Sequence, residues 1–157
     1  MGILDLDADL SFNEKTLAQT DGKASIQVAK LRLPSQNLTN FLGMMIPPLN
    51  LGILKGKMSV RSGTLEFSNF QLGSLDADLK GTLTGNIRLG EDLSRSDLNI
   101  TLRLQASDKL LKNNDAKGFL AFMDSAVGTG QPGNYALVLN GPIDQASTFF
   151  PKKAVND

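Results

Sequence analysis

The chain has 157 residues, enough for one globular domain, and its 16 basic and 16 acidic side chains give a formal net charge of zero. This balance provides no overall basic field for a phosphate backbone, so we expect no nucleic acid partner. The sequence also lacks histidine, cysteine and tryptophan. These absences exclude Ser-His-Asp and Cys-His nucleophiles, imidazole and thiolate metal sites, and disulfides. Acid–base chemistry by Asp, Glu, Lys or Tyr135, and cation sites built from oxygen ligands, remain open.

Residues 1–7 have no basic segment and already carry acids at Asp5 and Asp7, so they do not resemble a signal peptide. They lead at once into a strand-like pattern. We therefore expect a targeting or anchoring segment ahead of Met1. No run of 18 apolar residues occurs, and the nearest approach, 38–54, contains asparagines and paired prolines.

A period of two, typical of strands with one apolar face, dominates the chain. It runs through 4–12, 75–89, 98–106 and 135–141. In the 15-residue stretch 75–89, Gly81 and Gly85 predict a bend or bulge, so we expect one long curved strand or two collinear strands. The runs 24–33 and 65–72 each change phase by one residue, which predicts a β-bulge in both.

Turn residues separate these runs and predict sequential antiparallel neighbours in the middle of the chain, a meander. The turns are expected at Asp21-Gly22, Ser62-Gly63, Gly73-Ser74 and 90–92.

Two segments break the period and predict helices. Segment 34–43 follows a proline suited to a first helical turn and precedes Pro47-Pro48. Segment 107–126 has helical spacing of apolar residues and a cap at Ser107 or Asn114, and 128–134 is loop-like in composition. In total we expect roughly seven strands and two short helical insertions.

Three acidic side chains at the start, Asp5, Asp7 and Asp9, resemble the first half of a calcium loop. Such a loop needs glycine at its sixth position and an acid at its twelfth, where this chain has Leu10 and Thr16. We interpret these acids as the polar face of a strand, because charge along an edge strand discourages aggregation.

A second acidic pair, Asp76 and Asp78, is predicted on one strand face about 7 Å apart. Paired carboxylates can act as acid and base, but Lys80 and Arg88 continue the same face and favour a solvated surface of mixed charge.

Gly128-x-Gly130-x-x-Gly133 matches dinucleotide-binding spacing. It follows a helical pattern and precedes a strand, the reverse of the required order, so we interpret it as a loop.

The alternating strands leave a Leu-rich apolar face with two interpretations. It is either the inner face of a closed sandwich or barrel, or the concave side of a sheet that holds an acyl chain or a partner's apolar segment. The candidate binding face on the two central strand runs comprises Leu75, Leu79, Leu83, Ile87, Leu98, Ile100, Leu102 and Leu104.

The stretches 54–70 and 76–89, with the pattern Gly81-x-Leu-x-Gly-x-Ile-x-Leu89, resemble the β-repeats of AsmA-like periplasmic proteins. Segments 93–104 and 109–112, and the ending 139–143, resemble the C-terminal part of the type II secretion system protein N family, GspN. The similarity spans roughly residues 50–145 and rests on degenerate repeats.

This resemblance implies a single non-catalytic periplasmic domain over residues 1–157, normally tethered to the inner membrane by a segment absent from this chain. The expected fold is mainly β: one strongly curved, half-open antiparallel sheet with one or two short helices on the apolar face. The expected function is protein export through contacts with other type II secretion subunits, without a cofactor. The alternative is a lipid-binding or lipid-transfer module with a hydrophobic groove; a third hypothesis is a hydrolase using Asp76 and Asp78.

Overall fold

The computed structural model describes residues 3–11, 21–38 and 44–144. These residues are mainly β, with one large antiparallel sheet, a two-stranded hairpin, two short α-helices and a 3₁₀ turn. The large sheet consists of β1 (Ile3–Ser11), β2 (Asp21–Leu33), β5 (Leu49–Arg61), β6 (Thr64–Leu72), β7 (Leu79–Arg88), β8 (Asp97–Ala106) and β9 (Asn134–Pro142). The hairpin consists of β3 (Gln36–Leu38) and β4 (Met44–Ile46).

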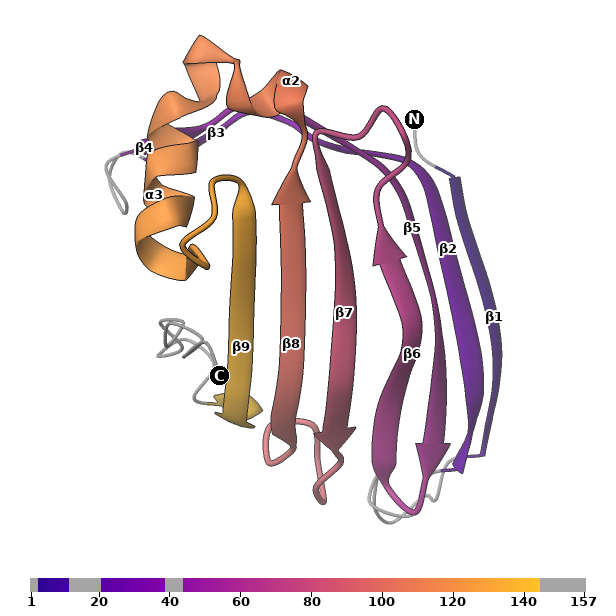
Figure 1. The fold of residues 1–157 in the computed structure, drawn as a ribbon. Coiled ribbons are helices and arrows are strands. Elements are labelled where there is room, and N and C mark those ends of the chain that lie inside the picture. Colours follow the sequence, from indigo (N-terminus) through magenta and orange to yellow (C-terminus); the bar gives the residue numbers. More distant parts are fainter. Residues whose placement is uncertain (1–2, 12–20, 39–43, 145–157) are drawn as a thin grey trace.

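The seven strands of the sheet follow the order β1-β2-β5-β6-β7-β8-β9, with each neighbouring pair antiparallel. From β5 to β9 the strands are sequential neighbours, so the predicted meander is confirmed. Among the described strands, β1 and β9 lie at opposite edges and do not pair (Figure 1). The sheet is therefore open, which excludes the closed barrel for this part of the chain.

Both predicted bulges are confirmed. The register of β2 on β5 shifts between Val28 and Leu31, and that of β6 on β7 shifts between Phe67 and Phe70. At the first bulge Leu31 lies opposite Gly52, whose φ of 68° is a conformation that glycine adopts without strain. Beyond this bulge, β2 and β5 cross the upper ends of β7 and β8 toward the small hairpin beside α3 (Lys117–Val127) (Figure 1).

The strand predicted over 75–89 is shorter than expected, because β7 begins only at Leu79. Residues 75–78 form a turn in which the Ala77 N–H donates to the Ser74 carbonyl over 3.2 Å. β7 is one continuous strand, and it pairs with β8 without a register shift at Gly81 or Gly85. The irregularity at this level belongs to β6 instead.

The predicted helical segment after β8 is confirmed as α2 (Asp108–Leu111), η2 (Asn114–Ala116) and α3. The Ser107 hydroxyl accepts from the Leu110 N–H over 3.2 Å, as an N-cap side chain should. Asn113 rather than Asn114 caps η2, since its side-chain oxygen accepts from the Asp115 N–H.

The helix predicted over 34–43 is wrong where that segment is described: 36–38 is strand β3, paired with β4, and residues 39–43 lie outside the described ranges. Strand pairing satisfies backbone groups that an isolated helical turn leaves to solvent. Asp21 and Gly22, predicted as a turn, are the first residues of β2.

The main buried cluster lies at one end of the sheet, between the strand ends and the helices. We call it the capped-end core, and its fully buried members are Leu49, Leu79, Ala106, Leu110, Ala116, Phe119, Leu120, Val127 and Tyr135. It brings together β5, β7, β8, β9, α2, η2 and α3. Helix α3 also contacts β4. The β3–β4 hairpin, which joins β2 to β5, and the helices therefore close this end of the sheet together.

Candidate functional site

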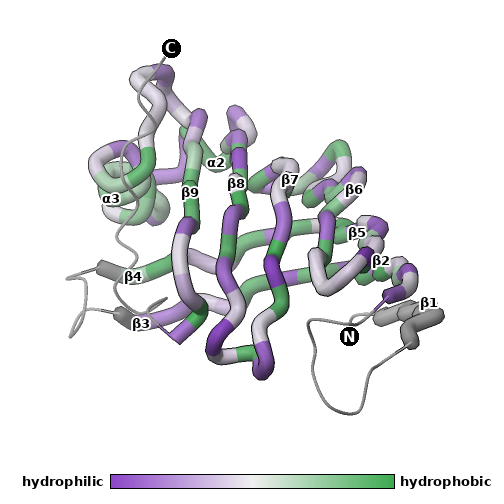
Figure 2. Tube along the Cα trace, turned by 90° about the horizontal axis from the view of Figure 1, so that it is seen from below, coloured by the Kyte–Doolittle hydropathy of each residue, from purple (hydrophilic) through white to green (hydrophobic). Residues whose placement is uncertain are grey.

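Apolar residues of β7, β8 and β9 lie opposite one another in the ladders. Leu83 is opposite Leu102, and Leu102 is opposite Leu137. Directly opposite residues of antiparallel neighbours place their side chains on the same side of a sheet. We call this the leucine side; on these strands its apolar residues are Leu79, Leu83, Ile87, Leu98, Ile100, Leu102, Leu104, Tyr135, Leu137 and Leu139. The intervening residues form the polar side, and Figure 2 shows the resulting alternation along β7 and β8.

One end of the leucine side belongs to the capped-end core. Leu79 is buried in this core, and Leu104 and Leu137 are half-buried against it. These residues are packed within the protein. Two of the eight predicted binding-face residues, Leu79 and Leu104, therefore contribute to stability at the capped end.

Toward the other end, four predicted residues lie outside the capped-end core and are half-buried. These are Leu83, Ile87, Leu98 and Leu102, and the register places Leu83 opposite Leu102 and Ile87 opposite Leu98. We call them the open-end leucine patch. The structure thus brings together four of the residues predicted from the sequence.

The other two predicted residues do not belong to this patch. Ile100 is already buried, although it lies outside the capped-end core. Leu75 is 97% exposed and lies in the turn before β7. The placement of Leu75 on the strand is therefore wrong, because the turn at 75–78 ends the alternation that the sequence continues.

Asp76 and Asp78 also lie in this turn, and the structure gives them different environments. The Asp78 side chain is buried and accepts the Asn50 N–H over 2.7 Å, while Lys109 Nζ lies 3.6 Å away. The Asp78 backbone donates to the Asn50 carbonyl and accepts from the Ser107 N–H. Asp78 therefore joins the beginnings of β5 and β7 to the β8–α2 junction.

Asp76 is exposed and accepts the Ser74 hydroxyl over 2.5 Å and the Asn50 side-chain amide over 3.2 Å. The Ser74 hydrogen bond is the main cause that lowers the pKa of Asp76, so this carboxyl is held in its ionised form. The sequence analysis predicted Asp76 and Asp78 on one strand face, and this prediction is wrong. Both acids lie in the turn before β7 and stabilise it through their hydrogen bonds.

Asp5, Asp7 and Asp9 lie on strand β1, as predicted, opposite Gln27, Ser25 and Lys23 of β2. Among the described side chains no three carboxylates gather closely enough to hold a metal ion. Residues 128–133 form the loop between α3 and β9, as their composition predicted, and Asn134 begins β9.

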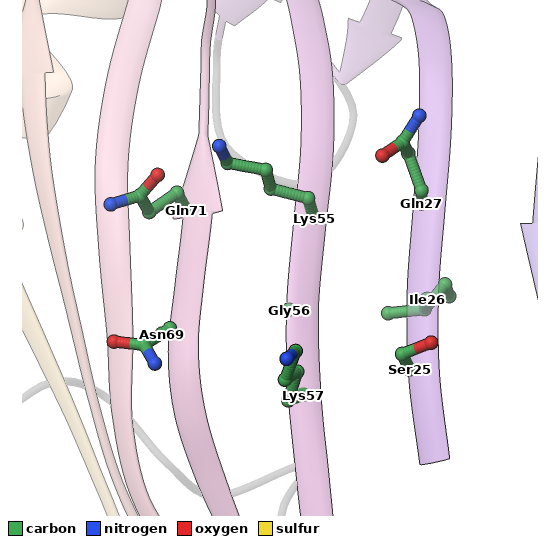
Figure 3. Close-up of a pocket in the computed structure, with 8 residues that line it drawn as sticks. All are labelled: Ser25, Ile26, Gln27, Lys55, Gly56, Lys57, Asn69 and Gln71. Carbon is green, nitrogen blue, oxygen red and sulfur yellow. The ribbon is translucent and has the colours of Figure 1, made fainter. Parts of the chain in front are cut away.

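A second surface, which the sequence analysis did not single out, lies on the polar side over β2, β5 and β6. A hollow of about 460 Å³ is lined by Ser25, Ile26, Gln27, Lys55, Gly56, Lys57, Asn69 and Gln71 (Figure 3). The sequence does contain a pattern that indicates it. Three basic residues of β5 are separated by even numbers of positions, so a strand places them on the same face, and all three are exposed: Lys55, Lys57 and Arg61.

No helix in the described part of the chain is both long enough and apolar enough to cross a membrane. Comparison of the chain with protein-family models, with curated proteins and with solved structures found no match.

Proposed function

We propose that this chain is a non-catalytic binding domain of the GspN and AsmA-like kind, which serves a type II secretion system in the periplasm. In this proposal the domain holds a protein partner on its open-end leucine patch, and a preceding segment tethers the whole protein to the inner membrane. The observation that carries the proposal is an open sheet whose leucine side enters a helix-covered core at one end only.

The chemistry of the patch supports a binding role. Leu83, Ile87, Leu98 and Leu102 carry no polar atom in their side chains, so contact with them removes apolar surface from water without leaving a polar group unpaired. A half-open sheet, curved around this side, would present them to a partner. Four register shifts, in the pairings of β2 with β5, β5 with β6 and β6 with β7, support curvature, since bulges bend strands and increase twist.

The environments of the acids support the non-catalytic part of the proposal. Asp78 is occupied by backbone hydrogen bonding and Asp76 is held ionised by Ser74, so neither is placed to exchange a proton with its neighbour.

The test measures binding to the periplasmic domains of type II secretion subunits, titrated one at a time. The variant carries Leu83→Asp and Leu102→Asp, and its matched control carries Thr82→Asp and Thr101→Asp on the polar side of the same strands. We expect at least tenfold weaker binding for the leucine variant only, because two desolvated apolar contacts are lost. If Asp prevents folding, Leu83→Thr and Leu102→Thr serve instead. Unchanged binding by a folded leucine variant would refute the proposal.

A lipid-binding function is the alternative, and the geometry of the patch favours it specifically. Its residues are all aliphatic, and from Leu83 to Ile87 they extend about 13 Å along one strand at roughly 3.3 Å per residue. Such a surface suits an acyl chain. Mass spectrometry of solvent extracts from the purified protein distinguishes the two: a stoichiometric lipid that disappears in the leucine variant supports this alternative, and its absence contradicts it.

A further inference from the structure

The polar side of the central strands carries an excess of positive charge. By register, six basic and two acidic residues share this side on β5, β6, β7 and β8. These residues are Lys55, Lys57, Arg61, Lys80, Arg88 and Arg103, and the acids Glu66 and Asp97. The central polar side therefore has a formal charge of +4 (6 − 2), in a chain whose total charge is zero.

Strand β1, at the edge of the sheet, carries three acidic residues, Asp5, Asp7 and Asp9. Asp7 of β1 is opposite Ser25 of β2, which is opposite Lys57 of β5. Since neighbouring strands are roughly 4.8 Å apart, the backbones that carry Asp7 and Lys57 are about 10 Å apart. That separation of the backbones is on the order of one Debye length at physiological ionic strength, whereas Asp9 of β1 lies directly opposite Lys23 of β2.

Two adjoining hollows lie among these basic residues. In the first, Lys55 and Lys57 flank Gly56 on β5, with Gln27 on one neighbouring strand and Gln71 on the other (Figure 3). The second, of about 520 Å³, shares Ser25 and Lys57 with the first and adds Lys23 and Arg61. Where side chains are described, no carboxylate forms an ion pair with Lys55, Lys57 or Arg61.

We propose that this part of the polar side docks on an anionic phospholipid surface, with headgroup phosphates in the two hollows. Ammonium groups supply the charge for a phosphate, and the Ser, Asn and Gln side chains between them supply neutral hydrogen bonds. From Lys55 to Arg61 the basic residues extend about 20 Å along β5, at roughly 3.3 Å per residue. An extended array of cations on a sheet face matches the many charges of a membrane surface better than it matches one small anion.

This docking is independent of the proposed function, because it uses the other side of the sheet. An experiment can therefore refute binding at the leucine side without refuting binding at the two hollows around Lys55 and Lys57, which we call the lysine hollows, and the reverse is also true.

The test is co-sedimentation of the full chain with phosphatidylcholine vesicles that contain or lack phosphatidylglycerol. The variant is Lys55→Gln with Lys57→Gln, and the matched control is Lys112→Gln with Lys117→Gln, which removes the same charge from exposed positions on the helical segment. We expect binding only to the anionic vesicles, weakened about tenfold in the β5 variant and less than about twofold in the control. Added salt should weaken the binding of the wild type.

Equal binding by the two lysine variants, or equal binding to both kinds of vesicle, would overturn the proposal. Inorganic phosphate distinguishes the source of the anion. Suppose that millimolar phosphate brings the NMR chemical-shift changes of Lys55 and Lys57 to saturation and also displaces the protein from vesicles. The site then binds free phosphate, and membrane docking is refuted. The Leu83 and Leu102 variants should bind anionic vesicles like the wild type, whether or not the proposed function holds.

Discussion

The two ends of the leucine side have the same residue types but different surroundings. At the capped end, Leu79 and Tyr135 are buried beneath α2, η2 and α3. At the open end, Leu83, Ile87 and Leu102 are half-buried and outside the main cluster. The strands are the same and the alternation is unbroken, so the difference between these leucines arises from what lies over each end of the sheet. Away from the helices, Ile100 and Phe70 are still buried on this side, so the open end is only partly exposed.

The largest expected effect is at the capped end. Leu110 is 2% exposed and is the buried residue of α2. Leu110→Ala should lower the free energy of unfolding by about 3 kcal/mol, because it removes buried apolar area and leaves a cavity among α2, α3 and the strand ends. Urea denaturation followed by circular dichroism measures this loss. A change below about 1 kcal/mol would mean that the helices do not pack on the sheet as described.

The next effect depends on pH and tests the same core. Tyr135 is 2% exposed, and its hydroxyl has no hydrogen-bond partner among the described residues. Burial, together with the nearby charge of Asp124, raises the pKa of Tyr135 from 10.0 to about 12. The folded state thus holds this proton more tightly than the unfolded state, so stability from this group is complete below pH 10 and is lost as the pH rises to about 12.

Over that interval the wild type should lose about 2–3 kcal/mol relative to Tyr135→Phe. Urea denaturation of both proteins across the interval isolates this difference. Tyr135 is the only tyrosine in the chain, so ultraviolet absorbance reports its titration directly. At neutral pH we expect Tyr135→Phe to be as stable as the wild type or slightly more so, because it removes an unpaired buried hydroxyl. Parallel loss in both proteins, or titration near pH 10, would contradict the buried environment.

The strands and the bulges were predictable from the sequence because each leaves a local mark. A phase change between Val28 and Leu31 marks one register shift, and the change between Phe67 and Phe70 marks the other. The covering of the sheet was not predictable in this way. Leu79 and Leu83 have the same period and the same residue type, and only the three-dimensional position of α2 and α3 distinguishes them.

A smaller effect is expected where Asp78, just before β7, accepts a hydrogen bond from the beginning of β5. Asp78→Ala removes the carboxylate that accepts the Asn50 N–H and leaves this partly buried donor unpaired, which should cost about 2 kcal/mol. Asp76→Ala, in the exposed part of the same turn, is the matched control and should cost clearly less. Thermal or urea denaturation of the two variants measures the contrast. Equal losses would show that the turn, rather than the Asp78 contact, joins the elements.

The errors at this turn and in segment 34–43 have a common physical cause. Alternation continues through Leu75 and Ala77, yet Asp78 forms hydrogen bonds with Asn50 and Ser107, which are distant in sequence. Likewise β3 pairs with β4 across residues whose own spacing is helical. In both places hydrogen bonding to another segment, distant for Asp78 and nearby for β3, overrides the local pattern of side chains. The lysine hollows escaped notice for a related reason, since their lining comes from three strands.

The smallest expected effect on stability is at the open end. Its size, set against the loss at Leu110, tests directly whether the two ends of the leucine side differ. Leu102 is half-buried and lies opposite Leu83 and Leu137. Leu102→Ala should cost about 1 kcal/mol, a third of the loss at Leu110, because less apolar area returns to water and no enclosed cavity forms. If the patch binds a partner or an acyl chain, the same variant should weaken that binding severalfold, whereas Leu110→Ala should leave the affinity of the folded fraction unchanged. Urea denaturation and a binding titration on both variants measure the two quantities. A loss at Leu102 as large as that at Leu110 would mean that the open end is a core as well, and that the working surface of the domain lies elsewhere.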